Sequence, residues 1–341
     1  MTNKRILVTG GAGYIGSHTV IELIAAGYEP VILDNLSNSD RKILKNINKL
    51  AGYQVPFVFG DCADPVIVGK VYKKYGPFKG IVHFAALKAV QESIHQPLRY
   101  YRNNLDGLMS LLEAAGQHGT GAFVFSSSCT VYGQPDKLPV RETTPLKDAE
   151  CPYGDTKEMA ERILHAVVRG GAALRIVALR YFNPIGAHAS GLIGELPIGA
   201  PKNLVPLVTQ AAAGNRGQLT VYGDDYNTPD GTCIRDYIHV VDLAKAHVRA
   251  LAYLQKQKEP SFYDIFNVGT GRGVSVMELL RTFEKETGVK VPYKVGPRRA
   301  GDIEKIYASV DKATKVLGWK AELTVKDALK SAWAWETGYC A

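Results

Sequence analysis

One glycine-rich segment restricts the fold of this chain more than any other part of its sequence. It follows the apolar run Ile6–Thr9 and reads Gly10-Gly11-Ala12-Gly13-Tyr14-Ile15-Gly16, after which a helical pattern begins. Side chains at the glycine positions would block the tight turn and keep the backbone away from a pyrophosphate, whereas the N-terminus of the helix offers free N–H groups and a partial positive charge. The segment therefore predicts a strand, a turn and a helix that bind a dinucleotide.

Short apolar runs alternate with helical patterns from Arg5 to about Arg180, which is typical of a parallel sheet built from crossover units. The sequence predicts an α/β fold with a doubly wound parallel sheet of the Rossmann type. We expect strands at Ile6–Thr9, Pro30–Leu33, Phe57–Phe59, Gly80–Phe84, Ala122–Ser126 and Leu174–Leu179, and helices near Tyr14–Ala26, Pro65–Tyr75, Leu98–Ala115 and Tyr153–Val168.

The pattern changes after Tyr181, where glycine and proline become frequent and the segments shorten. We expect a first domain over residues 1–180 and a smaller C-terminal α/β domain over residues 181–341 that binds the substrate, with some segments crossing between the two. In the second domain the sequence predicts strands at Leu219–Tyr222 and Phe262–Val268 and helices at Val240–Leu254 and Val274–Thr287.

The second predicted strand ends at Asp34, 18 residues after Gly16. A carboxylate roughly 20 residues after the glycines binds the ribose hydroxyls of a dinucleotide and repels a 2′-phosphate. The sequence therefore predicts NAD rather than NADP. The small polar run Asn35-Leu36-Ser37-Asn38-Ser39 suits contacts with adenosine and phosphate, and it suits an ordinary loop with a helix N-cap equally well.

A second group of residues indicates catalysis. Tyr153 and Lys157 are four residues apart at the start of a predicted helix and so share one face. A phenol is a poor base at neutral pH, but a nearby ammonium and a positively charged nicotinamide would both favour the phenolate. The fifth predicted strand ends in Ser126-Ser127-Ser128, and we expect the Ser128 hydroxyl to hydrogen-bond the reacting oxygen.

Composition excludes several other classes of function. The formal charge is +8, but the basic residues are spread along the chain and no nucleic-acid-binding motif is present. No segment has the apolar length of a signal peptide or a membrane span. The cysteines Cys62, Cys129, Cys151, Cys233 and Cys340 are scattered, which predicts reduced thiols and no metal site. We expect a cytoplasmic protein that binds neither nucleic acid nor membrane.

Several motifs together resemble one family from end to end. The chain is similar to the UDP-glucose 4-epimerases of the extended short-chain dehydrogenase/reductase family. The resemblance rests on Val8–His18, His83–Lys88, Ser126–Ser128, Tyr153 with Lys157, Arg180–Pro184, Arg235–Val240 and Arg298–Asp302.

The resemblance implies a reversible epimerisation of UDP-glucose and UDP-galactose at C4. Tyr153 would remove the proton of the 4-hydroxyl while a hydride passes to tightly held NAD, and the 4-keto sugar would turn over before the hydride returns. Lys157 would bind the nicotinamide ribose and tune Tyr153. The resemblance also implies a homodimer formed through helices of the first domain.

The same resemblance assigns the remaining site residues. The residues expected to contact NAD are Gly10, Gly13, Tyr14, Ile15, Gly16, Asp34, Asn35, Leu36, Ser37, Asn38, Ser39, Asp61, Cys62, Phe84, Ala85, Ala86, Lys88, Asn103, Ser126, Tyr153, Lys157 and Tyr181. Those expected to contact the UDP-sugar are Lys88, Ser128, Tyr153, Phe182, Asn183, Asn203, Leu204, Thr220, Val221, Tyr222, Arg235, Tyr237, Arg299, Asp302 and Ile306.

Departures from the family pattern leave some questions open. Cys129 stands where the family often has Ala, and Cys151 where Asn is frequent. Ile306 stands at the gate of the sugar pocket, where a bulky Tyr is associated with plain hexoses and a small residue with N-acetylhexosamines, so acceptance of N-acetylated sugars stays open.

Three rival functions remain to be weighed. A 4,6-dehydratase would need an acidic pair where this chain has Ser128-Cys129-Thr130, so that activity is disfavoured. A uronate epimerase is harder to separate, because only pocket details near C6 of the sugar would differ. A non-catalytic NAD-binding sensor would have no need of Tyr153, Lys157 and Ser128 together.

Overall fold

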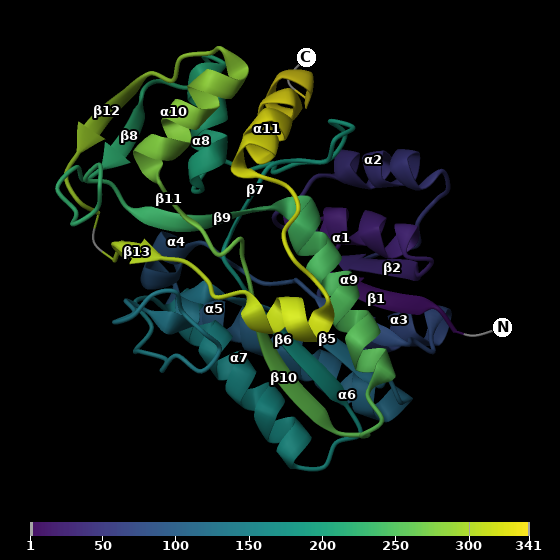
Figure 1. Ribbon diagram of the computed structural model, residues 1–341. Helices are drawn as coiled ribbons and strands as arrows, with labels where there is room; N and C mark the ends of the chain where they lie inside the picture. Colours follow the sequence, from purple (N-terminus) through teal and green to yellow (C-terminus); the bar gives the residue numbers. More distant parts are fainter. Residues whose placement is uncertain (1–2, 300, 340–341) are drawn as a thin grey trace.

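A computed structural model describes residues 3–299 and 301–339, so Ala300 and Cys340 of the segments discussed above lie outside the described residues. Its centre is a parallel sheet of seven strands in the order β10-β6-β5-β4-β1-β2-β3 (Figure 1). The strand order reverses between β1 and β4, which creates the crevice where such sheets bind ligands. The strands are β1 (Arg5–Thr9), β2 (Glu29–Asp34), β3 (Phe57–Phe59), β4 (Gly80–His83), β5 (Ala122–Ser128), β6 (Arg175–Tyr181) and β10 (Phe262–Val268).

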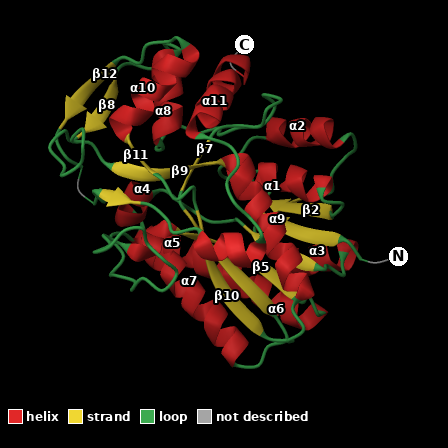
Figure 2. Cartoon of the chain, in the orientation of Figure 1, coloured by secondary structure: helices red, strands yellow, loops and turns green. Residues whose placement is uncertain are grey.

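Helices cover both faces of this sheet, and the alternation of side chains along each strand assigns the faces (Figure 2). Ile6 and Val8 pack in one buried cluster, and Leu7 packs in another on the opposite face. Helices α1 (Tyr14–Ala25), α2 (Arg41–Ala51) and α9 (Val240–Lys256) contribute to the first cluster, whereas α3 (Pro65–Tyr75), α6 (Gly107–His118) and α7 (Pro152–Arg169) contribute to the second. The predicted doubly wound α/β fold is confirmed.

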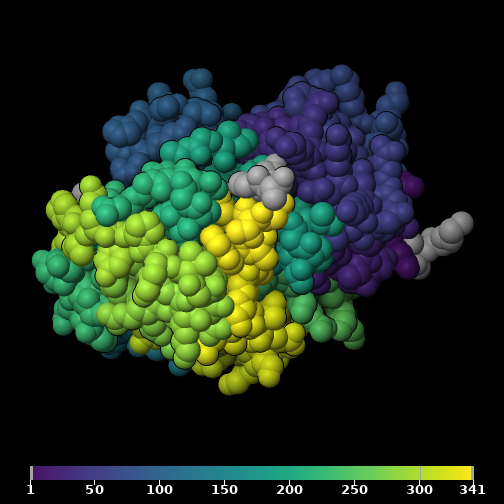
Figure 3. Space-filling view, turned by 90° about the horizontal axis from the view of Figure 1, so that it is seen from above, coloured from purple at the N-terminus to yellow at the C-terminus, as the bar shows by residue number. Residues whose placement is uncertain are grey.

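A smaller region lies beyond the carboxyl ends of the strands and has its own buried cluster. Figure 3 shows the C-terminal segment between this region and the first one. A four-stranded sheet contains β7 (Asn183–Ile185), β9 (Ile234–His239), β11 (Gly273–Ser275) and β13 (Lys305–Ile306), and a two-stranded sheet pairs β8 (Leu219–Tyr222) with β12 (Tyr293–Gly296). The helices of this region are α8 (Leu204–Ala212), α10 (Val276–Thr287) and α11 (Val325–Tyr339).

The structure differs from the sequence prediction at several points. In the second region, α8, α11 and the strands β7, β9, β11, β12 and β13 were not predicted. Helix α2 was not expected. The expected helix over 98–115 is divided into α5 (Pro97–Tyr101), a π-helical turn (Arg102–Asp106) and α6, and it follows the short helix α4 (Val90–His95). Strand β10 belongs to the seven-stranded sheet, where it pairs in parallel with β6, because Phe266 and Val268 bury their side chains in the cluster beneath α9.

The described helices include none with the length and apolar character needed to span a membrane.

Candidate active site

The glycine loop between β1 and α1 has the geometry that the sequence predicts. A Cβ atom on Gly16 would lie 2.1 Å from the carbonyl oxygen of Gly10, and one on Gly10 would lie 2.7 Å from the backbone nitrogen of Ala85. Helix α1 begins after Gly13 without a side-chain cap, so the first N–H groups of this helix are left for a ligand. These features fit the pyrophosphate of a dinucleotide.

Asp34 ties the end of β2 back to this loop. Its Oδ2 accepts a hydrogen bond from the backbone N–H of Ala12 at 3.0 Å, and its Oδ1 accepts from Leu36 at 2.8 Å. Leu36 has a φ of 56°, a left-handed conformation that is uncommon outside glycine and directs the chain around the carboxylate. Burial raises the pKa of Asp34, while the two backbone hydrogen bonds oppose this shift. The Ser39 hydroxyl also donates to Oδ1 at 3.4 Å, so Oδ2 is the oxygen that retains a lone pair for a ribose hydroxyl.

Other expected cofactor residues surround the same edge of the sheet. The Asn35 amide donates to Asp61 at 3.1 Å and so joins the ends of β2 and β3. Cys62 is buried in the core beneath α6, and burial raises the pKa of its thiol to about 12, so its side chain is an unreactive packing group. Lys88 lies in the segment after β4, and its ammonium nitrogen is 3.7 Å from a carboxylate oxygen of Glu195.

Helix α7 brings the three expected catalytic residues together. Tyr153 is its second residue, and Lys157 follows one turn later. The Lys157 ammonium donates to the backbone oxygen of Ser126 at 2.8 Å and lies 6.0 Å from the centre of the Tyr153 ring. Ser128 lies at the end of β5, and its hydroxyl is close enough to lower the pKa of Tyr153. All three side chains are buried at the carboxyl edge of the sheet.

The electrostatics of this centre differ in one respect from the expectation. Burial raises the pKa of Tyr153 well above its ordinary value, and Tyr181 acts in the same direction, whereas the Ser128 hydroxyl opposes them. Burial also lowers the pKa of Lys157 to about 8, against the influence of Glu161. The chain's own groups therefore leave Tyr153 protonated, because burial disfavours the phenolate and is the largest influence on its pKa.

The expected uridine-diphosphate residues lie on the second region. Strand β9 carries Arg235 beside Ile306 of β13, its partner in the parallel register. Arg299 donates to Asp302 at 2.8 Å, and its guanidinium lies 5.2 Å from the centre of the Tyr222 ring on β8. The Arg299 side chain is 46% exposed, so it can still reach a phosphate while paired.

A buried apolar cluster, which we call the apolar wall, contains two of the residues expected to contact the sugar. Phe182 and Ile306 are buried in a cluster with Val131, Tyr132 and Val140. Val221 and Tyr237 are buried in the core of the second region, and Asn203 is the N-cap residue of α8, directly before Leu204. Ile306 therefore packs in the same cluster as residues of the short helix that follows Ser128.

Comparison with known proteins decides the family. A curated UDP-glucose 4-epimerase of Mus musculus is 48% identical over 339 residues, which cover 98% of this chain and 96% of that protein. The crystal structure of a UDP-glucose 4-epimerase from Bifidobacterium longum in complex with NAD+ and UDP has a TM-score of 0.93 at 46% identity and covers 98% of both chains. One from Stenotrophomonas maltophila with bound NAD and formylated UDP-arabinopyranose has a TM-score of 0.95 at 45% identity and covers 99% of both.

The chain belongs to the UDP-glucose 4-epimerase family. A family model described as GDP-mannose 4,6 dehydratase also matches residues 7–332. This member of the epimerase family nevertheless has Ser128, Cys129 and Thr130 at the end of β5 and in the short 3-10 helix that begins at Cys129. Hydroxyls and a thiol cannot supply the acidic pair for water elimination, so the local chemistry agrees with the epimerase relatives.

Two glutamates of this epimerase-family chain were missed by the sequence prediction. Glu161 lies one turn after Lys157 on α7, accepts from Ser127 at 2.5 Å and pairs with the buried Arg180 at 2.6 Å. Its spacing from Lys157 was a usable signal, because residues four apart share a helix face. Glu195 lies in an irregular segment, where sequence spacing indicates nothing about its neighbours.

Proposed function

We propose that this chain catalyses the reversible C4 epimerisation of UDP-glucose and UDP-galactose with tightly bound NAD. The observation that carries the proposal is the buried group of Ser128, Tyr153 and Lys157 at the carboxyl edge of the sheet, beside the glycine loop. Full-length relatives named UDP-glucose 4-epimerase support it. The enzyme is an isomerase, since the sugar leaves with the same composition with which it entered.

Tyr153 acts as the base towards the 4-hydroxyl of the sugar. The glycine loop, Asp34 and Lys157 would hold NAD, which would supply a reversible hydride transfer at C4 of the sugar and a positive charge that favours the Tyr153 phenolate. Lys157 contributes a second positive charge, held in place by its hydrogen bond to the Ser126 oxygen. Together these charges bring the pKa of Tyr153 down from the high value that burial imposes. Ser128 orients the reacting oxygen and Tyr153 towards each other.

The 4-keto sugar turns over in the pocket, so its opposite face meets the returning hydride. Arg235 and Arg299 hold the diphosphate during this rotation, since guanidinium groups form charge-assisted hydrogen bonds with phosphate oxygens. Asp302 accepts from ribose hydroxyls, and Asn183 and Asn203 hold the diphosphate end. Because these contacts leave the hexose unanchored on one side, the sugar can rotate while the nucleotide stays bound. We propose that residues 1–180 form the cofactor-binding part and residues 181–341 the substrate-binding part, with α9 and β10 crossing back to the main sheet.

The decisive experiment gives the purified protein UDP-galactose without added cofactor and separates the products by chromatography. We expect UDP-glucose to form, because NAD is held tightly and regenerated in each cycle. Absence of conversion with NAD both retained and added would contradict the proposal. UDP-glucuronate is then the next substrate, since a uronate epimerase differs only in the pocket near C6.

The same experiment with UDP-N-acetylgalactosamine tests the role of Ile306. This side chain is 1% exposed in the apolar wall, and its size lies between those of Tyr and a small residue. We propose that it forms the gate of the sugar pocket. Conversion of UDP-galactose alone would make it a restrictive gate, and conversion of both sugars a permissive one.

We also propose that the enzyme is a cytoplasmic homodimer. Leu98, Met109 and Met159 expose apolar side chains on α5, α6 and α7, and Leu98 is 73% exposed. A second copy would bury them in a helical interface. Sedimentation over a range of concentrations tests this assembly, and a monomer at every concentration would contradict it.

A further inference from the structure

Glu195 joins three parts of the site that are far apart in the sequence. Its carboxylate accepts from the Asn203 amide at 2.5 Å and lies 3.7 Å from the Lys88 ammonium. Its backbone oxygen accepts from the indole N–H of Trp335 at 3.0 Å. The first contact is on the expected substrate side, the second is on the expected cofactor side, and the third comes from the C-terminal helix α11.

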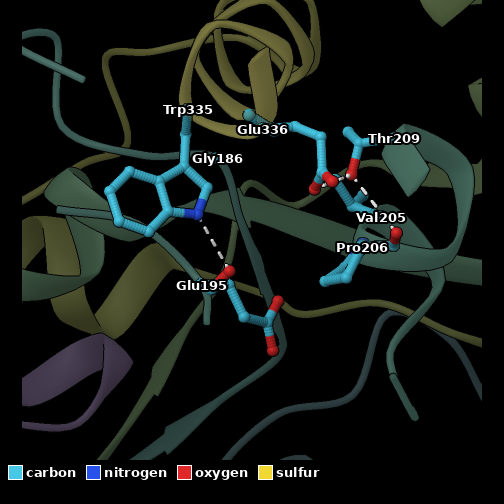
Figure 4. A pocket seen from close by; sticks show the side chains of 8 residues that line it. Gly186, Glu195, Val205, Pro206, Thr209, Trp335 and Glu336 are labelled. Carbon is cyan, nitrogen blue, oxygen red and sulfur yellow. Dashed lines mark hydrogen bonds between the residues drawn. The ribbon is translucent and has the colours of Figure 1, made fainter. Parts of the chain in front are cut away.

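The backbone at this position is held in place by α11. A Cβ atom on Gly194 would lie 2.5 Å from the Trp335 ring, so only glycine allows the chain to pass this close to the indole. Figure 4 shows the indole nitrogen directed at the Glu195 backbone oxygen, while the Glu195 side chain extends away from the ring. The carboxylate is therefore presented to Lys88 and Asn203 from a rigid support.

The side chain of Glu195 is 13% exposed and that of Lys88 is 44% exposed. A half-exposed ion pair of this length contributes little to stability. A buried carboxylate accepts hydrogen bonds and does not donate them, so it requires the NH2 end of the Asn203 carboxamide to face it. Within the described residues, no donor is bonded to the side-chain oxygen of Asn203, whereas its backbone oxygen accepts from Leu207. Glu195 thus determines which end of this carboxamide is left for the ligand.

We propose that Glu195 is a positioning residue that orients Asn203 and couples the substrate side of the site to Lys88 on the cofactor side. This inference rests on the proposed function, because it assumes that Asn203 contacts a uridine diphosphate. Glu195→Gln has the same shape but removes the charge, and its NH2 group lets the Asn203 carboxamide turn over. Loss of this orientation weakens ligand binding without touching Tyr153.

The test measures UDP binding by calorimetry, which needs no turnover, alongside the kinetics with UDP-galactose. We expect E195Q to weaken UDP binding roughly tenfold and to raise KM similarly, with kcat within threefold of the unmodified enzyme. Glu336→Gln is the matched control, because Glu336 lies near the same indole and accepts from Thr209 instead. We expect E336Q to bind UDP within twofold of the unmodified enzyme.

A double substitution tests whether Glu195 acts through Asn203. In an Asn203→Ala background, E195Q should weaken UDP binding by less than threefold. An undiminished tenfold loss there, or UDP binding within twofold of normal in E195Q itself, would overturn the proposal. Glu195→Asp keeps the charge but moves it away from both partners, so it should weaken UDP binding to an intermediate extent. If E195Q does not fold, this variant tests the proposal in its place.

The pH dependence separates positioning from a general structural role. Burial raises the pKa of Glu195, although Lys88 and Asn203 oppose the shift. UDP affinity should therefore fall more steeply on acidification in the unmodified enzyme than in E195Q, because the terminal phosphate of UDP is protonated equally in both measurements and only the unmodified enzyme also protonates Glu195. Tyr14 also faces Glu195, and it stays neutral over that range because its pKa is raised. If the unmodified enzyme binds UDP but does not convert UDP-galactose, the proposed function fails while these binding ratios still decide the role of Glu195.

Discussion

The catalytic centre and the uridine-diphosphate side are held in different ways. Tyr153 and Lys157 are 7% and 4% exposed and are fixed by α7 and the end of β5 against the parallel sheet. Arg299 is 46% exposed and is held by Asp302, three residues away. The reacting groups thus stand on elements of the main sheet and its helices, whereas Arg299 stands in the irregular segment between β12 and β13. Substitutions in the first region should change the rate, and those in the second should change affinity.

The largest effect is expected for Tyr153→Phe. Removing the phenolic oxygen removes the group to which we assign the role of the base, so kcat should fall by about a thousandfold. Chromatographic assay of UDP-galactose conversion measures this loss. Tyr72→Phe is the control, because Tyr72 is also buried and bonds Thr120 at 2.9 Å far from the site. It should lose about 1 kcal/mol of stability and keep its kcat. More than a tenth of normal kcat in Y153F would contradict the assignment.

Gly16→Ala should abolish retention of NAD. Because the added Cβ would lie 2.1 Å from the Gly10 oxygen, the loop must change shape and the helix N-terminus must withdraw from the pyrophosphate. We expect NAD affinity to fall at least about a hundredfold, measured by the NAD released from the purified protein on denaturation. Gly69→Ala in α3 is the matched control, since its Cβ would meet no atom within 4 Å. That variant should gain roughly 0.5–1 kcal/mol of stability and retain NAD, and equal NAD retention in the two variants would refute the loop assignment.

Arg299→Gln tests the uridine-diphosphate side, where substitutions should change affinity and not the rate. Loss of a charge-assisted hydrogen bond to a phosphate should raise KM for UDP-galactose about tenfold and leave kcat nearly unchanged. The neighbouring Arg298 has almost the same exposure but pairs with Asp225, so Arg298→Gln is a matched control and should change KM by less than twofold. Equal effects of the two substitutions would mean that only general surface charge attracts the substrate.

The smallest effect on catalysis or binding is expected for Ile306→Ala, which should change the relative rates with two substrates. Emptying the gate position should raise the rate with UDP-N-acetylgalactosamine relative to UDP-galactose by roughly fivefold, and the cavity should cost about 2–4 kcal/mol of stability. Ile238→Ala on β9 removes an equally buried side chain from the main core and should cost similar stability without altering this ratio. An unchanged ratio in I306A would assign Ile306 to packing alone.

Local patterns were sufficient to predict most of the first region. The glycine loop and the apolar strands are each determined by neighbours in the sequence, and the structure places β1, α1, β5 and α7 close to their expected bounds. Helix α2 was missed because Arg41–Ala51 is rich in polar residues. Its signals are nevertheless present, since Asp40 caps its first turn and Ile43 and Ile47 share its buried face.

The remaining features depend on contacts between distant segments. Nothing near Phe262–Val268 indicates that this strand pairs with β6, because the choice of sheet is made by packing under α9. The expected influence of Lys157 on Tyr153 stays a prediction, because the largest influence on the pKa of this phenol in the chain itself is its burial. Glu195 was missed for the same reason as the pairing of β10 with β6, since its partners Lys88 and Asn203 lie in other segments.

The position of β10 has a consequence for the synthesis of the protein. Six strands of the main sheet have left the ribosome by residue 181, but the strand that covers the outer edge of β6 ends only at Val268. Until then, the nascent chain exposes a row of unpaired backbone groups that could pair with another chain. A cut between residues 181 and 262 would therefore separate an incomplete sheet from its last strand, and neither fragment would correspond to an independent folding unit.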